Sequence, residues 1–179
     1  MHQGLAFALG YLRHPRRVGA IAPASKALAQ AILNEVMRSA PGTLIEVGAG
    51  TGAITRALLP ALDRAERFMV IERDAGFARL LSRHFPNLEV LNQCATRLDA
   101  LDIAARSPVT VVSSLPLLSM TRDEAHACVD AMVALIESRP GSRLIQYTYA
   151  SPHLRPFKEI PVGWRWRRAG RWPDTAARS

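Results

Sequence analysis

The stretch that decides the fold reads Leu44-Ile45-Glu46-Val47-Gly48-Ala49-Gly50-Thr51-Gly52-Ala53-Ile54-Thr55. Residues 43–47 are a short apolar run, typical of a buried strand, and residues 53–62 have the pattern of a helix. The glycines between them permit a sharp turn and leave room for a ligand to approach the main chain. In an open α/β sheet, ligands bind at this carboxyl edge of the strands.

Strand and helix signals alternate outward from this turn. Helices are expected after Ser25, over residues 75–85, and from the capping box formed by Thr121 and Glu124. Further strands are expected at residues 68–71, 88–91, 109–113 and 143–149, with an edge strand at 164–168. This alternation predicts an α/β fold with a mostly parallel, doubly wound sheet. We expect one domain over residues 25–179, preceded by an amphipathic segment over residues 1–24.

Positive charge is concentrated at the two ends of the chain. The 179 residues contain 23 Lys and Arg against 15 Asp and Glu, for a net charge of +8. Residues 1–34 have four basic residues and no acid, and residues 151–179 have seven basic and two acidic residues. The apolar content of 49% excludes wholesale disorder. Such an arrangement indicates an anionic partner, either nucleic acid or a membrane surface.

Cysteine usage and the N-terminus indicate a cytoplasmic protein. Cys94 and Cys128 lack the spacing of a metal site, so we expect no metal and two free, buried thiols. The apolar run at residues 5–12 precedes its basic cluster, the reverse of a secretory signal, and is too short to span a bilayer. The chain is expected in solution or on the cytoplasmic side of a membrane.

Two acidic residues suggest which ligand the glycine turn binds. Glu72 comes after the second expected strand, 24 residues beyond Gly48, where a carboxylate can take the ribose hydroxyls of a nucleoside. Glu46 would repel a pyrophosphate but suits a cation with an amino group and a sulfonium. A dinucleotide site and a ligand-free turn are the alternatives. The combination resembles motifs I and II of the class I S-adenosylmethionine (SAM) methyltransferases.

That resemblance implies a Rossmann-like fold, SAM as cofactor and S-adenosylhomocysteine as product. The implied cofactor-binding residues are Glu46, Gly48, Ala49, Gly50, Thr51, Gly52, Glu72, Arg73, Cys94, Ala95, Ser113 and Ser114. Cys94 stands where the family commonly has an Asp that contacts the adenine amino group. The backbone of Cys94 and Ala95, or the amide of Gln93, could hold adenine instead.

The segment after the fourth strand, Ser113-Ser114-Leu115-Pro116-Leu117-Leu118, bears on the substrate. Amino-methyltransferases acting on adenine have an Asn/Asp-Pro-Pro-Tyr-like motif at this place. Ser114 replaces its amide residue, and Leu117 replaces the aromatic ring that stacks on the base. We therefore expect an apolar lip and an aliphatic amine on an apolar molecule.

Four segments together resemble one family more closely. They are residues 10–25, the glycine turn, residues 113–118 and residues 146–149. In this order and spacing they are similar to the bacterial, membrane-peripheral phospholipid N-methyltransferases, which are related to the rRNA adenine dimethylases. The resemblance implies stepwise methylation of phosphatidylethanolamine and its mono- and dimethylated forms towards phosphatidylcholine. The chain diverges after Trp164.

The N-terminal segment then indicates a membrane contact. Leu5, Leu9 and Leu12 share one face of a helix, and basic residues come directly after it, as in an interfacial helix that favours anionic lipid. A core-packing helix with a solvated basic turn is the alternative. The expected substrate-binding residues are Tyr11, Arg13, His14, Arg16, Arg17, Leu115 and Pro116. His14 is also a candidate base.

Tyr147 and Tyr149 are the candidate catalytic residues. They lie two positions apart on the fifth expected strand and so point to one face, where either could contact the amine or the growing cation. Two core aromatics are the alternative. The sequence thus favours a lipid N-methyltransferase peripheral on the inner face of the membrane, with nucleic acid an unlikely partner. An RNA or DNA adenine methyltransferase and a non-enzymatic membrane-binding protein remain competing interpretations.

Overall fold

The computed structural model describes residues 26–104, 107–117 and 119–146. The expected N-terminal membrane segment, the edge strand at residues 164–168, Tyr147 and Tyr149 lie outside these residues. So do the charged ends, whose partner therefore stays a prediction.

The described elements have the expected alternation of strands and helices. The α-helices are α2 (Lys26–Met37), α3 (Ala53–Leu58), α4 (Ala75–His84) and α5 (Arg122–Glu137). The strands are β1 (Thr43–Val47), β2 (Arg67–Ile71), β3 (Glu89–Leu91), β4 (Val109–Ser113) and β5 (Arg143–Gln146). Two 3-10 helices, η1 (Leu59–Ala61) and η2 (Ala95–Ala100), complete the set. Within the described ranges, no helix is long and apolar enough to cross a membrane.

The five strands form one parallel sheet in the order β3-β2-β1-β4-β5. β1 lies at the centre, and its last residue, Val47, is in register with Ile71 of β2 and Ser113 of β4. The three strands therefore end level with one another. The turns after them meet at one edge of the sheet, which is where the sequence predicts the ligand site.

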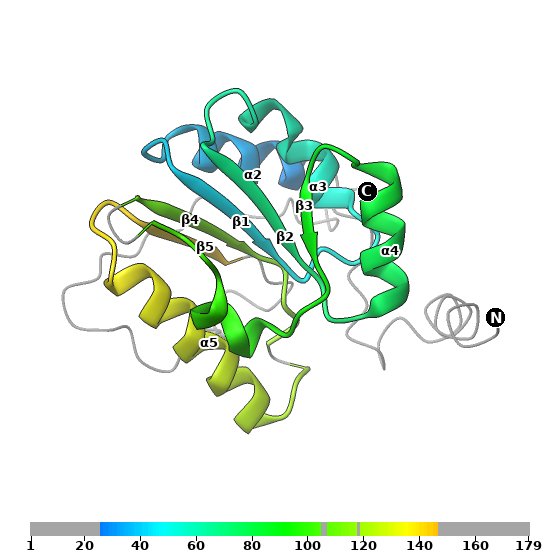
Figure 1. Cartoon of the computed structure of the whole chain (residues 1–179), viewed down its shortest axis with the longest axis vertical. Coiled ribbons are helices and arrows are strands. Elements are labelled where there is room, and N and C mark those ends of the chain that lie inside the picture. Colours follow the sequence, from blue (N-terminus) through cyan, green and yellow to red (C-terminus); the bar gives the residue numbers. More distant parts are fainter. Residues whose placement is uncertain (1–25, 105–106, 118, 147–179) are drawn as a thin grey trace, which may run out of the picture.

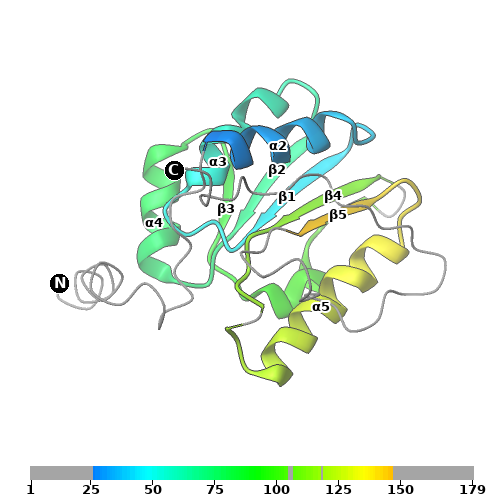
Figure 2. The same ribbon diagram turned by 180° about the vertical axis from the view of Figure 1, so that it is seen from behind.

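Helices cover both faces of the sheet, as the doubly wound prediction requires. α2, α3 and α4 lie on one face, and α5 and η2 lie on the other (Figures 1 and 2). Side chains of β1 alternate between the two cores: Leu44 packs with Ile32 of α2 and Leu58 of α3, whereas Ile45 packs with Met132 of α5. Because strand side chains have a period of two, Glu46 shares the face of Leu44.

Two local features differ from the sequence prediction. The helix expected over residues 53–62 ends at Leu58 and tightens into η1, where Pro60 provides no backbone N–H. η2 was not expected. The capping box is confirmed, since the Thr121 hydroxyl accepts the backbone N–H of Glu124 at the start of α5.

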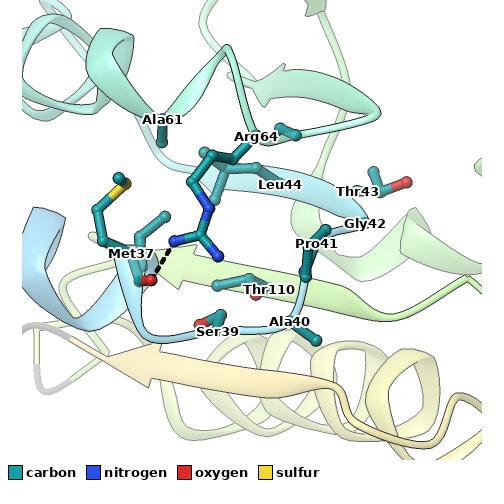
Figure 3. Close-up of a pocket in the computed structure, with 12 residues that line it drawn as sticks. Met37, Ser39, Ala40, Pro41, Gly42, Thr43, Leu44, Ala61, Arg64 and Thr110 are labelled. Atoms are coloured by element: carbon teal, nitrogen blue, oxygen red, sulfur yellow. Dashed lines mark hydrogen bonds between the residues drawn. The ribbon is translucent and has the colours of Figure 1, made fainter.

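A small pocket lies at the opposite, amino edge of the sheet (Figure 3). Arg64 reaches across it and donates a hydrogen bond to the carbonyl of Met37. The volume of the pocket is about 20 Å³, enough for roughly one water molecule. This pocket is therefore a small gap between α2 and the loop after η1, far from the glycine turn.

The glycine turn between β1 and α3 depends on backbone conformations that favour glycine. Gly50 has φ +55° and Gly52 has φ +83°, both in the left-handed region. A Cβ atom on Gly52 would lie 2.8 Å from Phe85 Cε2 and 2.9 Å from Leu81 Cδ2, whereas one on Gly50 would meet no atom within 4 Å. Gly52 is thus needed for packing against α4, and Gly50 leaves open space beside the loop.

The two glycines should respond differently to alanine. Gly50→Ala should cost only the strain of a left-handed alanine, about 1–2 kcal/mol of unfolding free energy. Gly52→Ala should cost about 1–3 kcal/mol more, because the methyl group overpacks against Leu81 and Phe85. Urea unfolding of both variants measures the difference, and equal losses would contradict the packing role of Gly52.

Candidate active site

Glu72 joins the turns after β1 and β2. Its Oε2 accepts the backbone N–H of Gly50 at 2.8 Å, and its Oε1 accepts the backbone N–H of Asp74 at 2.8 Å. The side chain is buried, although each carboxylate oxygen can accept a further hydrogen bond. Glu72 therefore sets the shape of the glycine turn and still presents acceptors at the edge of the sheet.

Glu46 is a fully buried acid two residues before the glycine turn. Both of its carboxyl oxygens are inaccessible and have no hydrogen-bond partner among the described residues. Burial raises the pKa of this carboxyl to about 7. The hydroxyl and backbone of Thr55 lie close to this carboxyl, although outside hydrogen-bond geometry, and oppose the rise in pKa, whereas the nearby Glu72 adds to it. An acid in this state favours a bound cation that would restore its charged form.

The residues after β4 lie directly against the glycine turn. The backbone N–H of Ser114 donates to the carbonyl of Val47 at 2.9 Å. The Leu115 side chain lies so close to Gly48 that a Cβ there would approach Leu115 Cδ2 to 2.9 Å. Ser114 Oγ is buried and has no hydrogen-bond partner within the described part of the chain. The structure thus brings Ser113 and Ser114 beside the expected cofactor loop.

Leu117 does not form the apolar lip expected from the sequence. Its side chain is buried in the core on the α5 face of the sheet, in the cluster that contains Ile45 and Met132. The prediction was wrong because the chain after Pro116 turns inward, with the N–H of Leu117 donating to the carbonyl of Leu115. Pro116 is exposed and Leu115 is half-buried, so these two remain at the surface.

The loop after β3 contains the expected adenine-side residues. Ala95 is buried, whereas Cys94 is only partly buried, contrary to the expectation of two buried thiols. Thr96 hydrogen bonding lowers the pKa of the Cys94 thiol, and the neighbouring Arg73 acts in the same direction. Arg73 is exposed and pairs with Glu124 at 3.7 Å. Both thiols are free, and burial raises the pKa of Cys128.

Sequence reasoning missed two residues that contribute to the candidate site. The Asn92 side chain donates to the carbonyls of Glu72 and Arg73, each at 2.9 Å, and so fastens the β3 loop to the β2 turn. Thr55 lies one turn into α3 with its hydroxyl wholly buried beside Glu46. The sequence contained a signal for each: Asn92 is a polar residue directly after an apolar strand, and Thr55 is a polar residue on the inner face of a helix. Among the described residues, no group of acids, histidines and cysteines could hold a metal ion.

Comparison with known proteins yields relatives of two kinds. No protein-family model matches the chain. A "ribosomal RNA small subunit methyltransferase A" of Xanthobacter autotrophicus is 42% identical over 137 residues, covering 69% of this chain and 46% of the relative. An "ornithine lipid N-methyltransferase" of Singulisphaera acidiphila is 32% identical over 77 residues, covering 43% of this chain and 40% of the relative. The chain spans about half the length of the curated relatives it matches.

Solved structures agree on the fold. The carbon methyltransferase CurJ superposes with a TM-score of 0.60 at 18% identity, covering 82% of this chain and 41% of CurJ. The N-methyltransferase NodS of Bradyrhizobium japonicum, bound to S-adenosylhomocysteine, gives a TM-score of 0.55 at 17% identity, covering 81% and 71%. The chain therefore has the Rossmann-like fold of the class I SAM-dependent methyltransferases and is related in sequence to the ribosomal RNA small subunit methyltransferases.

Proposed function

We propose that this chain is a SAM-dependent N-methyltransferase acting on phosphatidylethanolamine and its mono- and dimethylated forms, towards phosphatidylcholine, at an anionic membrane surface. The observation that supports the cofactor is Glu46, an acid buried beside the glycine turn with no hydrogen-bond partner among the described residues. The observation that supports the acceptor is the set of residues 114–117 after β4, which contain a serine hydroxyl and no aromatic ring.

The residues at the carboxyl edge fit SAM. Glu46 offers a carboxyl to an ammonium or sulfonium charge, and the free acceptor capacity of Glu72 suits ribose hydroxyls. The space beside Gly50 lets a ligand approach the main chain. Arg73, Cys94, Ala95, Ser113 and Ser114 are proposed to complete the site. When bound, SAM supplies a methyl group on a positively charged sulfur that an amine nitrogen can displace in line.

The chain's contribution to the reaction is to position the amine and to favour its free base. An ammonium has no lone pair, and an aliphatic amine ordinarily titrates near ~10, so a proton must leave first. A buried site that already holds a cation disfavours the ammonium form. Holding the nitrogen and the methyl carbon in line then provides most of the acceleration. Ser114 Oγ, which is buried without a hydrogen-bond partner among the described residues, is proposed to orient the amine, and Tyr147 and Tyr149 stay predicted contacts.

The acceptor is inferred from the residues after β4. Ser114 provides a hydroxyl where an adenine methyltransferase would present an amide. Leu117 stands where such an enzyme has an aromatic ring, and its side chain is buried in the core. These residues give a base little to stack on, whereas a small, flexible amine needs no stacking surface. The relative named for ornithine lipid N-methylation also has a lipid amine as its acceptor.

Ribosomal RNA is the second candidate substrate. The relatives named for ribosomal RNA methylation do not support the expectation that nucleic acid is an unlikely partner. A methylated adenine would need the same cofactor site and differ only in the acceptor. RNA therefore belongs in the activity assay beside lipid.

Loss of the Glu72 carboxylate should weaken cofactor binding. In Glu72→Gln, the side-chain amide can place an N–H group against the N–H of Gly50 or of Asp74, which distorts the glycine turn. We expect at least a tenfold weaker affinity for SAM, roughly 1.4 kcal/mol or more. Isothermal titration calorimetry measures this, with Asp63→Asn as a control that removes an exposed acid at the other edge. Unchanged affinity in Glu72→Gln would contradict the assignment.

Glu46 should make SAM binding depend on pH. With a folded-state pKa of about 7, the carboxyl is largely protonated at pH 6 and ionised at pH 8. Because a cation favours the ionised form, affinity for SAM should rise roughly tenfold over this range, with proton release on binding at the lower pH. Glu46→Gln should bind more weakly and with a flat pH profile.

Glu46 should also make the stability of the protein depend on pH, in the opposite direction to the affinity for SAM. A carboxyl whose pKa is raised on folding binds its proton more tightly in the folded state, so unfolding free energy falls as pH rises from about 4.5 to about 7. Glu46→Gln should lack this fall in urea unfolding experiments without ligand. A wild-type profile identical to that of the variant would show that Glu46 is not buried in the acid form.

Methyl transfer itself should be tested with both acceptors in one assay. With methyl-labelled SAM, we expect label in phosphatidylethanolamine vesicles that contain anionic lipid and none in small-subunit ribosomal RNA. Glu72→Gln should abolish the lipid label, and Asp63→Asn should retain it. Label in RNA and not in lipid would overturn the proposed substrate, and label in neither would overturn the enzyme assignment.

A further inference from the structure

A groove of about 330 Å³ lies between α4 and β3, outside the proposed active site. β3 is the edge strand of the described sheet, and α4 lies beside it in both views (Figures 1 and 2). The groove is lined by Ala75, Ala78, Arg79, Ser82, Arg83, Val90 and Asn92. It is thus formed by one helix face and an open sheet edge, with no acid among its lining residues.

Two guanidinium groups dominate the charge of this groove. Arg79 and Arg83 are exposed and one helical turn apart, and neither forms an ion pair with any described residue. Like charges at this spacing disfavour a helix, and only Arg83, in the last turn, gains from the helix dipole. The nearby Asp74 carboxylate is engaged by the N–H groups of Gly76 and Phe77. A bound anion would relieve this repulsion.

The shape and chemistry of the groove select among anions. Guanidinium groups match the oxygens of a phosphate. Ser82 and Asn92 also line the groove, but their donors are already used, by the carbonyl of Ala78 and by the carbonyls of Glu72 and Arg73. The other lining residues, Ala75, Ala78 and Val90, are small or aliphatic. Single-stranded RNA is usually held by stacking on aromatic rings, and this groove has none. A lipid headgroup needs only the positive charge beside an apolar surface.

We propose that the α4–β3 groove binds the phosphate of an anionic phospholipid headgroup and so forms a membrane contact separate from the active site. Asn92 lies at the end of the groove and its amide fastens the β2 turn through the carbonyls of Glu72 and Arg73. A headgroup in the groove would therefore sit one residue from the loop assigned to adenine. The site binds phosphate whether or not the protein methylates lipid.

The test uses the full chain with a charge-matched pair of double variants. Arg79→Gln/Arg83→Gln removes the groove charge, and Arg122→Gln/Arg143→Gln removes two exposed arginines elsewhere. Co-sedimentation with phosphatidylcholine vesicles containing phosphatidylglycerol, at fixed ionic strength, should show roughly 10- to 30-fold weaker binding for the groove variant. The control double variant should lose much less of its vesicle binding. Equal losses of vesicle binding in the two double variants would show that net charge alone controls binding, and would contradict a phosphate site in the groove.

Two further measurements separate the site from its alternatives. Inorganic phosphate should raise the melting temperature of the wild type and of Arg79→Lys/Arg83→Lys above that in matched chloride, but not that of the glutamine variant. If the groove variant loses binding to single-stranded RNA and keeps binding to vesicles, the partner is RNA and the proposal fails. Neither measurement depends on methyl transfer, so failure here leaves the proposed function untouched, and failure of the activity assay leaves the groove untouched.

Discussion

The hydrogen bonds of one carboxylate, Glu72, hold the candidate site in shape. Three short parallel strands end level at the carboxyl edge, but level ends alone do not determine how the turns after them fold. Glu72 accepts one backbone N–H from the glycine turn and one from the turn before α4, so it joins two crossover connections that are far apart in sequence. Charge-assisted hydrogen bonds of this kind are stronger than neutral ones, which suits a turn with so many glycines.

Glu46 shows the opposite situation, a buried acid that finds no hydrogen-bond partner among the described residues. A buried carboxyl without a hydrogen-bond partner destabilises the fold, and an apolar residue would pack on this face of β1 beside Leu44 without that cost. The proposed cationic ligand would account for its presence. Thr55 lies beside the carboxyl and tempers the rise in its pKa, which keeps the acid near the point where a bound cation can ionise it.

The basic residues of the described part of the chain divide into two groups. Some, such as Arg67 with Glu89 and Arg38 with Glu35, are paired and need no partner. Arg79 and Arg83 form no ion pair with any described residue, and they line one groove that has no acid among its lining residues. A membrane contact in this groove would lie near the carboxyl edge, because Asn92 lines the groove and belongs to the loop after β3, which suits an acceptor whose amine lies at the headgroup level.

Much of the fold could be predicted from local patterns. β1, β4 and the start of α5 were predicted to the residue, because an apolar run between turn residues and a capping box depend on neighbours in sequence. Local tightening at Pro60, the helix at residues 95–100 and the inward turn of Leu117 were not predicted. The helix at residues 95–100 and the position of Leu117 depend on packing between elements, since η2 packs against α5 and Leu117 fills a core whose shape no local pattern reveals.

The candidate site divides in the same way. The sequence by itself determined the parallel α/β sheet and the pairing of a glycine turn with Glu46 and Glu72, because residue type and spacing suffice for both. Only the tertiary structure decided that Glu46 is buried without a partner among the described residues, that Asn92 fastens the two loops, and that Arg79 and Arg83 face the open edge of β3. Burial, hydrogen-bond partners and shared grooves arise where elements distant in sequence meet, and no local pattern contains that information.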